Sequence, residues 1–150
     1  PVMDVVFHAL EQLPSTEFVL QLNPTSPLRT SEDIDSIINL CKEKRAPAVV
    51  SICESSKHPN WMFFCEMEGF LTPYENVPLA FRRQDLPKIF SLNGALFLAN
   101  SQWLMLKKQF VSLETHGYVM PPERSADIDT PLDWEWVEFL MKRNFSSKSS

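Results

Sequence analysis

The stretch EFVLQLNPTSPLRTSEDIDSIINLCKEKRAPAVVSICE, residues 17–54, predicts a strand, a helix and a second strand in close succession. The apolar runs Glu17–Leu22 and Pro47–Glu54 have the length and composition of buried strands. Between them, isoleucine side chains recur at helical spacing, and Thr30 or Ser31 can cap the amphipathic helix that they predict. Two strands joined by a helix through short links are typical of a βαβ unit, so we expect a parallel sheet.

The sequence on either side of this stretch predicts further helices and strands. Residues 1–13 place apolar side chains at helical spacing, so the sequence begins within an amphipathic helix. Residues 61–74 resemble two strands around a turn at Glu68 and Gly69, which predicts a hairpin, and residues 75–92 are expected to be extended or irregular. We expect further elements at residues 93–100 (a buried strand), 101–108 (a short helix) and 118–121 (a strand).

The last helix is predicted to have Thr130 as its N-cap and Pro131 at its first position. Its inner face should consist of Trp134, Val137 and Leu140 or Met141. The sequence as a whole predicts one α/β core, interrupted by an excursion from about Lys57 to Leu92.

The composition is that of a globular domain. The chain has 150 residues, of which 44% are hydrophobic and 22% are charged, enough for one core. Its formal net charge of −5 argues against nucleic acid as a partner, because no basic face is available to neutralise phosphates. No apolar run approaches membrane-spanning length, and no signal-peptide pattern is present. The three cysteines lack metal or CxxC spacing and indicate reduced thiols, so we expect a cytoplasmic protein without a membrane partner.

A first cluster of polar side chains follows the first strand. Between Asn23 and Thr30, two prolines stiffen a loop that also carries Thr25, Ser26 and Arg29. Ligands of parallel α/β sheets bind beyond such strand ends, so this loop could form a rigid polar wall for a hydroxylated or anionic ligand. It could also be a structural turn with a helix cap, and spacing alone favours that second interpretation.

Two further clusters are weak signals when taken singly. Asp127 and Asp129 are two residues apart, so on an extended chain both carboxylates face the same way and suit Mg²⁺. Alternatively, Asp129 only stabilises the start of the next helix. Arg82 and Arg83 could clamp a carboxylate or phosphate, and the Asn-Gly pair at 93–94 could let a ligand approach the backbone, but adjacent arginines are usually solvated surface.

The three histidines, His8, His58 and His116, show no spacing suited to a shared metal or to a nucleophile–base pair. Motif chemistry alone therefore stops at an α/β domain with a candidate site for an anionic ligand.

Three motifs, taken together and in this order, carry a more specific resemblance. LNPTSPLRTSEDID (residues 22–35), RQDLPKIFSLNGALFL (83–98) and ERSADIDTPLDWEWVEFL (123–140) resemble the motifs of the acylneuraminate cytidylyltransferases, also called CMP-sialic acid synthetases. The resemblance implies a partial Rossmann-like nucleotidyltransferase sheet flanked by helices, with a dimerisation hairpin or extension inserted at about residues 57–92. It also implies a homodimer that transfers CMP from CTP to the anomeric hydroxyl of a sialic acid, releases pyrophosphate and uses Mg²⁺.

The resemblance also implies roles for individual residues. Asp127 and Asp129 would bind Mg²⁺, Asp129 the more directly, and Asp129 and Arg83 would be catalytic. The substrate-binding set would be Asn23, Ser26, Arg29, Arg83, Asn93 and Phe97.

Some residues depart from the family pattern. Asn23 stands where the family usually has glutamine, Phe97 where it commonly has tyrosine, and Trp61 close to where some members carry lysine. A related acceptor such as legionaminic or pseudaminic acid is therefore an alternative, whereas a 3-deoxy-octulosonate cytidylyltransferase fits the motifs less well. The family's glycine- and lysine-rich phosphate-binding loop has no counterpart here. We therefore expect a C-terminal portion, poorly active alone, or a truncated, non-catalytic member that acts as an interaction or dimerisation module.

Overall fold

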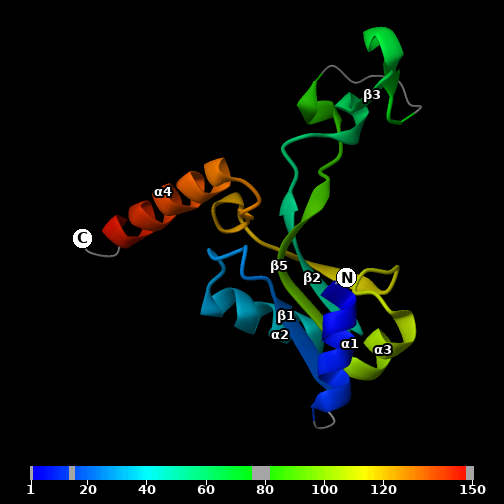
Figure 1. Ribbon diagram of the computed structural model, residues 1–150, viewed down its shortest axis with the longest axis vertical. Helices are drawn as coiled ribbons and strands as arrows, with labels where there is room; N and C mark the ends of the chain where they lie inside the picture. Colours follow the sequence, from blue (N-terminus) through cyan, green and yellow to red (C-terminus); the bar gives the residue numbers. More distant parts are fainter. Residues whose placement is uncertain (1, 14–15, 76–81, 148–150) are drawn as a thin grey trace. The chain divides into compact units, whose positions relative to one another are not determined.

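The computed structural model describes residues 2–13, 16–75 and 82–147 (Figure 1). The chain forms two compact units, one made of the residues up to Cys53 together with those from Leu92 onward, the other of Glu54–Ser91. The larger unit contains most of a four-stranded sheet with helices on both faces, and the smaller unit contains a two-stranded hairpin. No described helix is long and apolar enough to cross a membrane.

The four-stranded sheet has the order β1-β5-β2-β6. Its strands are β1 (Phe18–Leu22), β2 (Ala48–Glu54), β5 (Phe90–Asn100) and β6 (Thr115–Val119). β1 pairs antiparallel with β5, and β2 pairs parallel with β6.

The direction of β5 corrects one prediction. The amide N of Ser55 lies 3.0 Å from the carbonyl O of Ile89, and the amide N of Asn100 lies 2.8 Å from the carbonyl O of Pro47. The end of β2 therefore lies beside the start of β5, so these strands are antiparallel. β1 and β2 are parallel to each other, as predicted, but β5 separates them. The expected parallel sheet is a mixed one, because the chain leaves the sheet at the end of β2 and re-enters at that same end.

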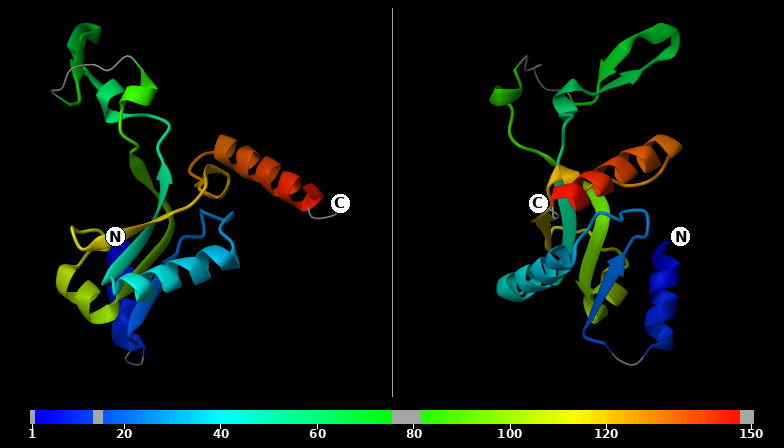
Figure 2. Two further views of the ribbon diagram at one scale, coloured as in Figure 1. Left: turned by 180° about the vertical axis from the view of Figure 1, so that it is seen from behind. Right: turned by 90° about the vertical axis from the view of Figure 1, so that its left-hand side faces the viewer.

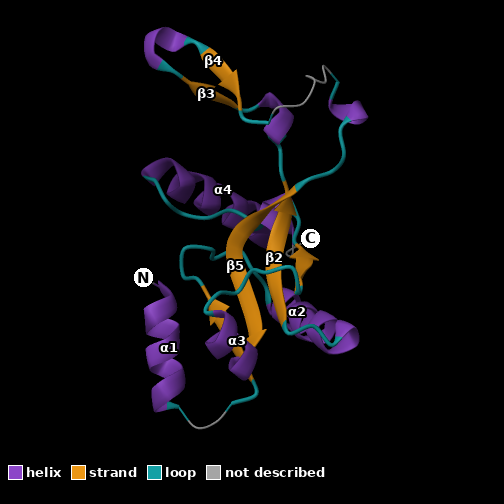
Figure 3. Ribbon diagram, turned by 90° about the vertical axis from the view of Figure 1, so that its right-hand side faces the viewer, coloured by secondary structure: helices purple, strands orange, loops and turns teal. Residues whose placement is uncertain are grey.

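Helices cover both faces of this sheet, which gives three layers (Figures 2 and 3). α2 (Ser31–Lys44) packs on one face, where Ile37 and Cys41 meet strand residues such as Leu96. α1 (Val2–Gln12) and α3 (Ser101–Lys107) pack on the other face. The neighbouring residues Val49 and Val50 belong to opposite core clusters, as the alternation of side chains along a strand requires.

Both predicted helix caps are confirmed. The side chain of Thr30 accepts a hydrogen bond from the Asp33 amide, and the Asp33 side chain accepts one from the Thr30 amide, which makes a capping box at the start of α2. α4 (Pro131–Ser147) begins in the same way, with Asp133 Oδ2 2.7 Å from the Thr130 amide N. Each reciprocal pair satisfies backbone N–H groups that a helix start would otherwise leave unpaired.

The predicted inner face of α4 is correct for two residues and wrong for a third. Val137 and Leu140 are buried with Leu28, but Trp134 is 56% exposed. Among the described residues, the apolar side chains in this cluster are Leu28 and those of residues 126 and 128, so the buried stripe is narrow.

The smaller unit contains the predicted hairpin, formed by β3 (Phe63–Cys65) and β4 (Leu71–Pro73) (Figure 3). Glu68 and Gly69 make its turn with φ values of 68° and 86°. The residues from 75 to 92 were predicted to be extended or irregular, but β5 already begins at Phe90, and residues 76–81 lie outside the described residues. The hairpin exposes its apolar side chains, which are Phe63, Phe64, Met67, Phe70, Leu71 and, next to it, Tyr74.

Candidate functional site

The loop that follows β1 is held together by its own hydrogen bonds. Nη1 of Arg29 lies 2.6 Å from the carbonyl O of Ser26 and also donates to the carbonyl O of Asn23. The Ser26 amide donates to that same Asn23 carbonyl at 3.3 Å. Arg29 therefore fixes the loop through contacts to its backbone, and the structure gives this predicted substrate-binding residue a structural role.

Residues from three separate motifs meet at this loop. Ser26 is fully buried, and its Oγ donates to Asp127 Oδ1 at 3.1 Å across 101 residues of sequence. Gly94 has a φ of +76°, and a Cβ built on it would lie 3.4 Å from Asp127 Oδ2 and 3.7 Å from Asn23 Nδ2. Asn23 follows β1 and Asp127 follows β6, so both lie beyond the carboxyl ends of strands that run the same way. This is the edge of an α/β sheet where ligands bind. We call the set Asn23, Ser26, Gly94 and Asp127 the motif junction.

Asn93 lies next to the motif junction in a buried network. Its Oδ1 accepts from Ser51 Oγ at 2.5 Å and from the Ala95 amide at 3.2 Å, and its Nδ2 donates to Ser125 Oγ at 3.0 Å. Nδ2 also lies 3.4 Å from the sulfur of Met120. These partners occupy its donors and acceptors, so the predicted hydrogen bond from Asn93 to a sugar would require this network to open.

The two predicted metal ligands differ in their surroundings. Asp127 is half-buried, and one of its carboxylate oxygens accepts a hydrogen bond from Ser26 Oγ. Asp129 is exposed, and its backbone N–H donates to Asp133 Oδ2 at 3.2 Å. Within the described residues, no three side chains of His, Cys, Asp or Glu gather closely enough to hold a metal ion. The donor set still fits Mg²⁺, because that ion takes one or two carboxylates and completes its shell with water and phosphate oxygens.

The other two predicted site residues are not part of the motif junction. Arg83 belongs to the smaller unit, where its Nη2 lies 3.4 Å from the carbonyl O of Ser55 and 3.9 Å from Glu54 Oε1. Phe97 packs into the core beneath α1 and α3, with its ring 5.4 Å from that of Phe110. The structure thus gives Phe97 a packing role.

An ion pair between a buried carboxylate and a partly exposed guanidinium was missed by the sequence reasoning. Asp33 is fully buried, its Oδ1 lies 2.8 Å from Arg124 Nη2, and the same oxygen accepts from Tyr118 Oη at 2.9 Å. Burial by itself raises the pKa of Asp33, but the hydrogen bonds from Arg124, from the Thr30 backbone and from Tyr118 outweigh it and lower the pKa from 3.8 to about 2. The pair ties the start of α2 to the segment that leads to Asp127. Its only sequence signal was an acid in a first helical turn, which local capping already explains.

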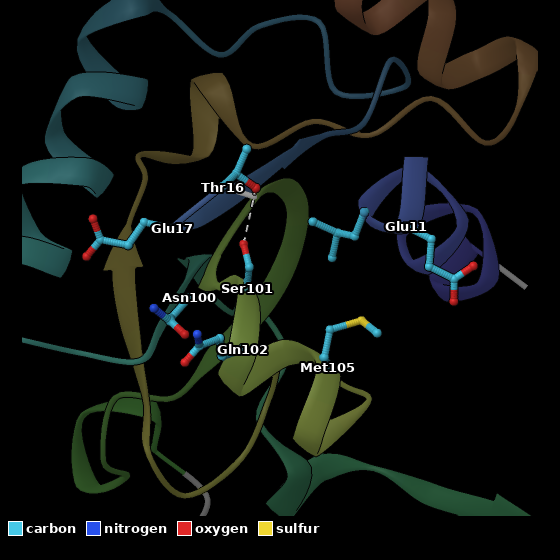
Figure 4. A pocket seen from close by; sticks show the side chains of 8 residues that line it. Glu11, Thr16, Glu17, Asn100, Ser101, Gln102 and Met105 are labelled. Atoms are coloured by element: carbon cyan, nitrogen blue, oxygen red, sulfur yellow. Dashed lines mark hydrogen bonds between the residues drawn. The ribbon is translucent and has the colours of Figure 1, made fainter. Parts of the chain in front are cut away.

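A separate hollow of about 860 Å³ lies between α1 and the start of α3 (Figure 4). Among the residues that line it, Thr16 Oγ1 and Ser101 Oγ are hydrogen-bonded at 3.4 Å, and the carboxylates of Glu11 and Glu17 point away from these two hydroxyls. None of the predicted site residues lines it.

No family model matches the chain, but individual proteins do. It is 36% identical over 118 residues to an N-acylneuraminate cytidylyltransferase of Streptococcus agalactiae serotype V, a match that covers 79% of this chain and 28% of that protein. It is 32% identical over 150 residues to a CMP-N,N'-diacetyllegionaminic acid synthase of Legionella pneumophila, covering 95% of this chain and 62% of that protein. The chain thus spans less than two thirds of the length of either relative.

Solved structures show the fold. A CMP:2-keto-3-deoxy-manno-octonic acid synthetase complexed with CTP matches with a TM-score of 0.64 and 12% identity, over 96% of this chain and 69% of that one. A 4-diphosphocytidyl-2C-methyl-D-erythritol synthase from Anaerococcus prevotii matches with a TM-score of 0.61 and 13% identity, over 91% and 64%. The predicted Rossmann-like α/β fold is confirmed. The sequence relatives likewise confirm the resemblance stated from the three motifs, which is to the acylneuraminate cytidylyltransferases, a family of nucleotidyltransferases.

Proposed function

We propose that this chain carries the acid-sugar side of a site that transfers CMP from CTP to the anomeric hydroxyl of a nonulosonic acid and releases pyrophosphate. The observation that carries the proposal is the motif junction, where Asn23, Ser26 and Asp127 approach one another from distant parts of the sequence. The relatives named as cytidylyltransferases for neuraminic and legionaminic acids support the reaction class.

The residues divide into those that would meet substrate and those that support them. Asn23 would hydrogen-bond the sugar through Nδ2, since its Oδ1 already accepts from Gln21 Nε2 at 2.8 Å. Arg83 would bind an anionic group of the sugar or of CTP. Arg29 and Asn93 hold the loop and the strand behind these groups.

Asp127 and Asp129 would hold Mg²⁺ together with phosphate oxygens of CTP. When bound, the metal would offset the negative charge that develops on the leaving pyrophosphate. Ser26 keeps one oxygen of Asp127 oriented, which fixes the carboxylate before any ligand arrives. We propose the cytoplasm as the location, because CTP is the donor and Cys41, Cys53 and Cys65 form no disulfide with one another.

The test is pyrophosphate release from CTP and Mg²⁺ by this chain, with and without an acceptor. Three acceptor sugars are compared: N-acetylneuraminic acid, N,N'-diacetyllegionaminic acid and pseudaminic acid. All three are included because Asn23 and Phe97 depart from the family pattern, so the identity of the acceptor is part of the test. Because the family's phosphate-binding loop has no counterpart in this sequence, we expect slow but acceptor-dependent release. Asp127→Asn should abolish it, and Asp35→Asn, on the exposed side of α2, should leave it unchanged. A folded chain that releases no pyrophosphate with any acceptor would contradict catalysis by this chain.

A second candidate function is an interaction module, and the exposed hairpin favours it. Phe70 is 69% exposed, Leu71 64% and Phe64 53%, in a unit whose described strands are only three residues long. Interfaces are enriched in such aromatic side chains. We propose a homodimer formed through the hairpin, whether or not the chain turns over CTP. Sedimentation equilibrium tests it, and a monomer at all concentrations would contradict it.

A further inference from the structure

The buried carboxylate of Asp33 collects hydrogen bonds from three parts of the larger unit. Arg124, at the end of the short helical turn Pro122–Arg124, binds it through two nitrogens, with Nε 2.8 Å from Oδ2 and Nη2 2.8 Å from Oδ1. Tyr118 Oη on β6 donates to Oδ1 at 2.9 Å. The amide and hydroxyl of Thr30, the N-cap of α2, donate to Oδ2 at 2.9 and 3.1 Å. One side chain therefore connects α2, β6 and the segment that follows β6.

Asp33 and Arg124 lie on the two segments that meet at the motif junction. Asp33 comes directly after the loop that follows β1, and Arg124 lies three residues before Asp127. A hydrogen bond from the Ile128 amide to the carbonyl O of Thr25, at 2.9 Å, joins the same two segments. The segment that contains Asp127 is thus attached to the first loop on both sides of that residue.

The Asp127 carboxylate has few contacts of its own. Ser26 Oγ donates to its Oδ1 at 3.1 Å, and the structure shows no other hydrogen bond to this carboxylate among the residues that it describes. Its Oδ2 lies on the side of Gly94, 3.4 Å from where a Cβ on that residue would be. The place of the carboxylate therefore depends on the backbone of its segment, which the Arg124 contact fixes at one end and the Ile128 bond at the other.

An ion pair of this kind is better suited to fixing a geometry than to adding stability. Taking a carboxylate and a guanidinium out of water costs free energy that their attraction roughly repays, so replacing both partners by uncharged side chains is often close to neutral. A bidentate arginine–carboxylate contact nevertheless sets both a distance and an orientation, which a single contact does not. Because every oxygen of Asp33 has partners, the network favours one arrangement of the two segments.

We propose that Arg124 is a positioning residue, which Asp33 and Tyr118 lock so that the segment after it holds the Asp127 carboxylate in place for a divalent cation. Arg124 acts through the backbone that leads to Asp127 and meets no ligand itself. The part played by the cation rests on the proposed function, whereas the positioning of the segment is a property of the unliganded chain.

Hydrogen exchange followed by NMR, without metal or substrate, measures this positioning in the 150-residue chain. Exchange of the Ile128 amide reports whether its segment stays on the first loop, and the amides of the central strand β5 report global unfolding. The test protein carries Asp33→Asn together with Arg124→Met, so both charges are removed at once. The asparagine oxygen can still accept from the Thr30 amide, and its NH₂ group can donate to the hydroxyl oxygen of Tyr118.

The matched control removes another ion pair of the larger unit. Lys107 Nζ lies 2.6 Å from Glu114 Oε2, just before β6 begins and thus at the opposite end of that strand from Asp127. Glu114→Gln together with Lys107→Met makes the same kind of change there.

We expect the Ile128 amide of the Asp33→Asn, Arg124→Met protein to exchange about tenfold faster or more than in the wild-type chain, while the amides of β5 stay within about threefold. The control protein should match the wild-type chain at both places. Acceleration at Ile128 no greater than in β5 overturns the proposal, because it would show a contribution to global stability alone. A wild-type Ile128 amide without protection overturns it as well.

Arg124→Lys keeps the test decisive if the double variant does not fold. Lysine retains the positive charge but replaces the two-nitrogen contact with a single one. Exchange at Ile128 should then rise about threefold, with the amides of β5 unchanged. Wild-type exchange at Ile128 in this variant contradicts the proposal.

A Mn²⁺ titration connects the positioning to the cation. Mn²⁺ prefers the same oxygen ligands as Mg²⁺ and broadens the NMR signals of nearby amides, so the signals of Gly94 and Asp127 report its binding. The Asp33→Asn, Arg124→Met protein should need about fivefold more Mn²⁺ than the wild-type chain for the same broadening, and equal requirements overturn the role of Arg124 toward the cation. If the wild-type chain binds no Mn²⁺, the proposed metal site fails, and the exchange at Ile128 still decides whether Arg124 positions the segment.

Discussion

The motif junction and the smaller unit differ in how far contacts within the chain satisfy or cover their side chains. At the junction, Ser26 and Asp127 bond to each other, and Arg29 bonds to the backbone of its own loop. In the smaller unit, the imidazole N–H of His58 has no partner, and the ring of Phe70 is 69% exposed. One region is already organised by internal contacts, and the other exposes apolar side chains that another molecule could cover.

Because of this difference, we expect the junction to contribute mainly to folding stability and the smaller unit mainly to binding or association. Substitutions around the junction should lower the free energy of unfolding, because each removes a partner from a buried polar group. Substitutions in the smaller unit should leave that free energy nearly unchanged and act on binding or association instead, because exposed groups contribute little to folding.

Arg124→Met should have the largest effect on stability. It leaves the fully buried carboxylate of Asp33 without its cationic partner. Because the Arg124 side chain is itself 34% exposed, we expect a cost of about 2 kcal/mol, below that of breaking a fully buried pair. Lys88→Met removes an exposed partner of Glu54 in the smaller unit and should cost less than about 1 kcal/mol. Urea unfolding followed by circular dichroism measures both. Equal losses in the two variants would mean that the Asp33 pair is no more important to folding than a surface pair.

The same ion pair predicts a dependence of stability on pH. The pKa of Asp33 is lowered from 3.8 to about 2, so its contribution is fully present above about pH 4 and is lost as the pH falls toward 2. A shift of this size corresponds to roughly 2 kcal/mol. The free energy of unfolding of the wild-type chain should therefore fall in this window by more than that of Arg124→Met. Parallel pH curves for the two proteins would show that Arg124 does not lower this pKa.

The features that the sequence predicted correctly depend on neighbouring residues. The caps at Thr30 and Thr130 and the hairpin turn at Glu68 and Gly69 were found because each feature is complete within a few residues. The direction of β5 was not found, because it depends on where the chain re-enters the sheet after an excursion of nearly forty residues.

The site shows the same limit at the level of side chains. The meeting of Asn23 and Asp127 was implied by three motifs, but no spacing indicated that Asn93 would have its amide occupied by internal partners. Asp33 was interpreted as an acid that favours a helix start, and its pairing with Arg124 spans 91 residues. Such contacts are set by tertiary packing, to which a single sequence gives no direct access.

Gly94→Ala and Gly69→Ala should have similar, smaller effects on stability. Both glycines have positive φ, at +76° and +86°, and an alanine in that region costs about 1 kcal/mol. A Cβ at Gly69 meets nothing within 4 Å, and one at Gly94 would be at ordinary contact distance from Asp127. Only Gly94→Ala should also weaken sugar binding in titration calorimetry. A loss of several kcal/mol at Gly94 alone would mean that the junction cannot adjust even to a methyl group.

Phe64→Ser and Phe139→Ser should have the smallest effects on folding and should differ in association. Phe64 is 53% exposed in the hairpin and pairs with Tyr74 at 5.6 Å, while Phe139 is 52% exposed on α4 and stacks on Trp136 at 5.4 Å. Because the ring pairs are so similar, each substitution should lower the free energy of unfolding by less than about 1 kcal/mol.

Sedimentation equilibrium then isolates what the smaller unit adds. If the hairpin is the dimer interface, Phe64→Ser should weaken self-association at least tenfold, and Phe139→Ser should leave it unchanged. Weakening by Phe139→Ser alone would move the interface to α4. Since the two rings have nearly the same exposure and ring contact, a difference between these variants reports which surface meets another molecule, and exposure by itself cannot account for it.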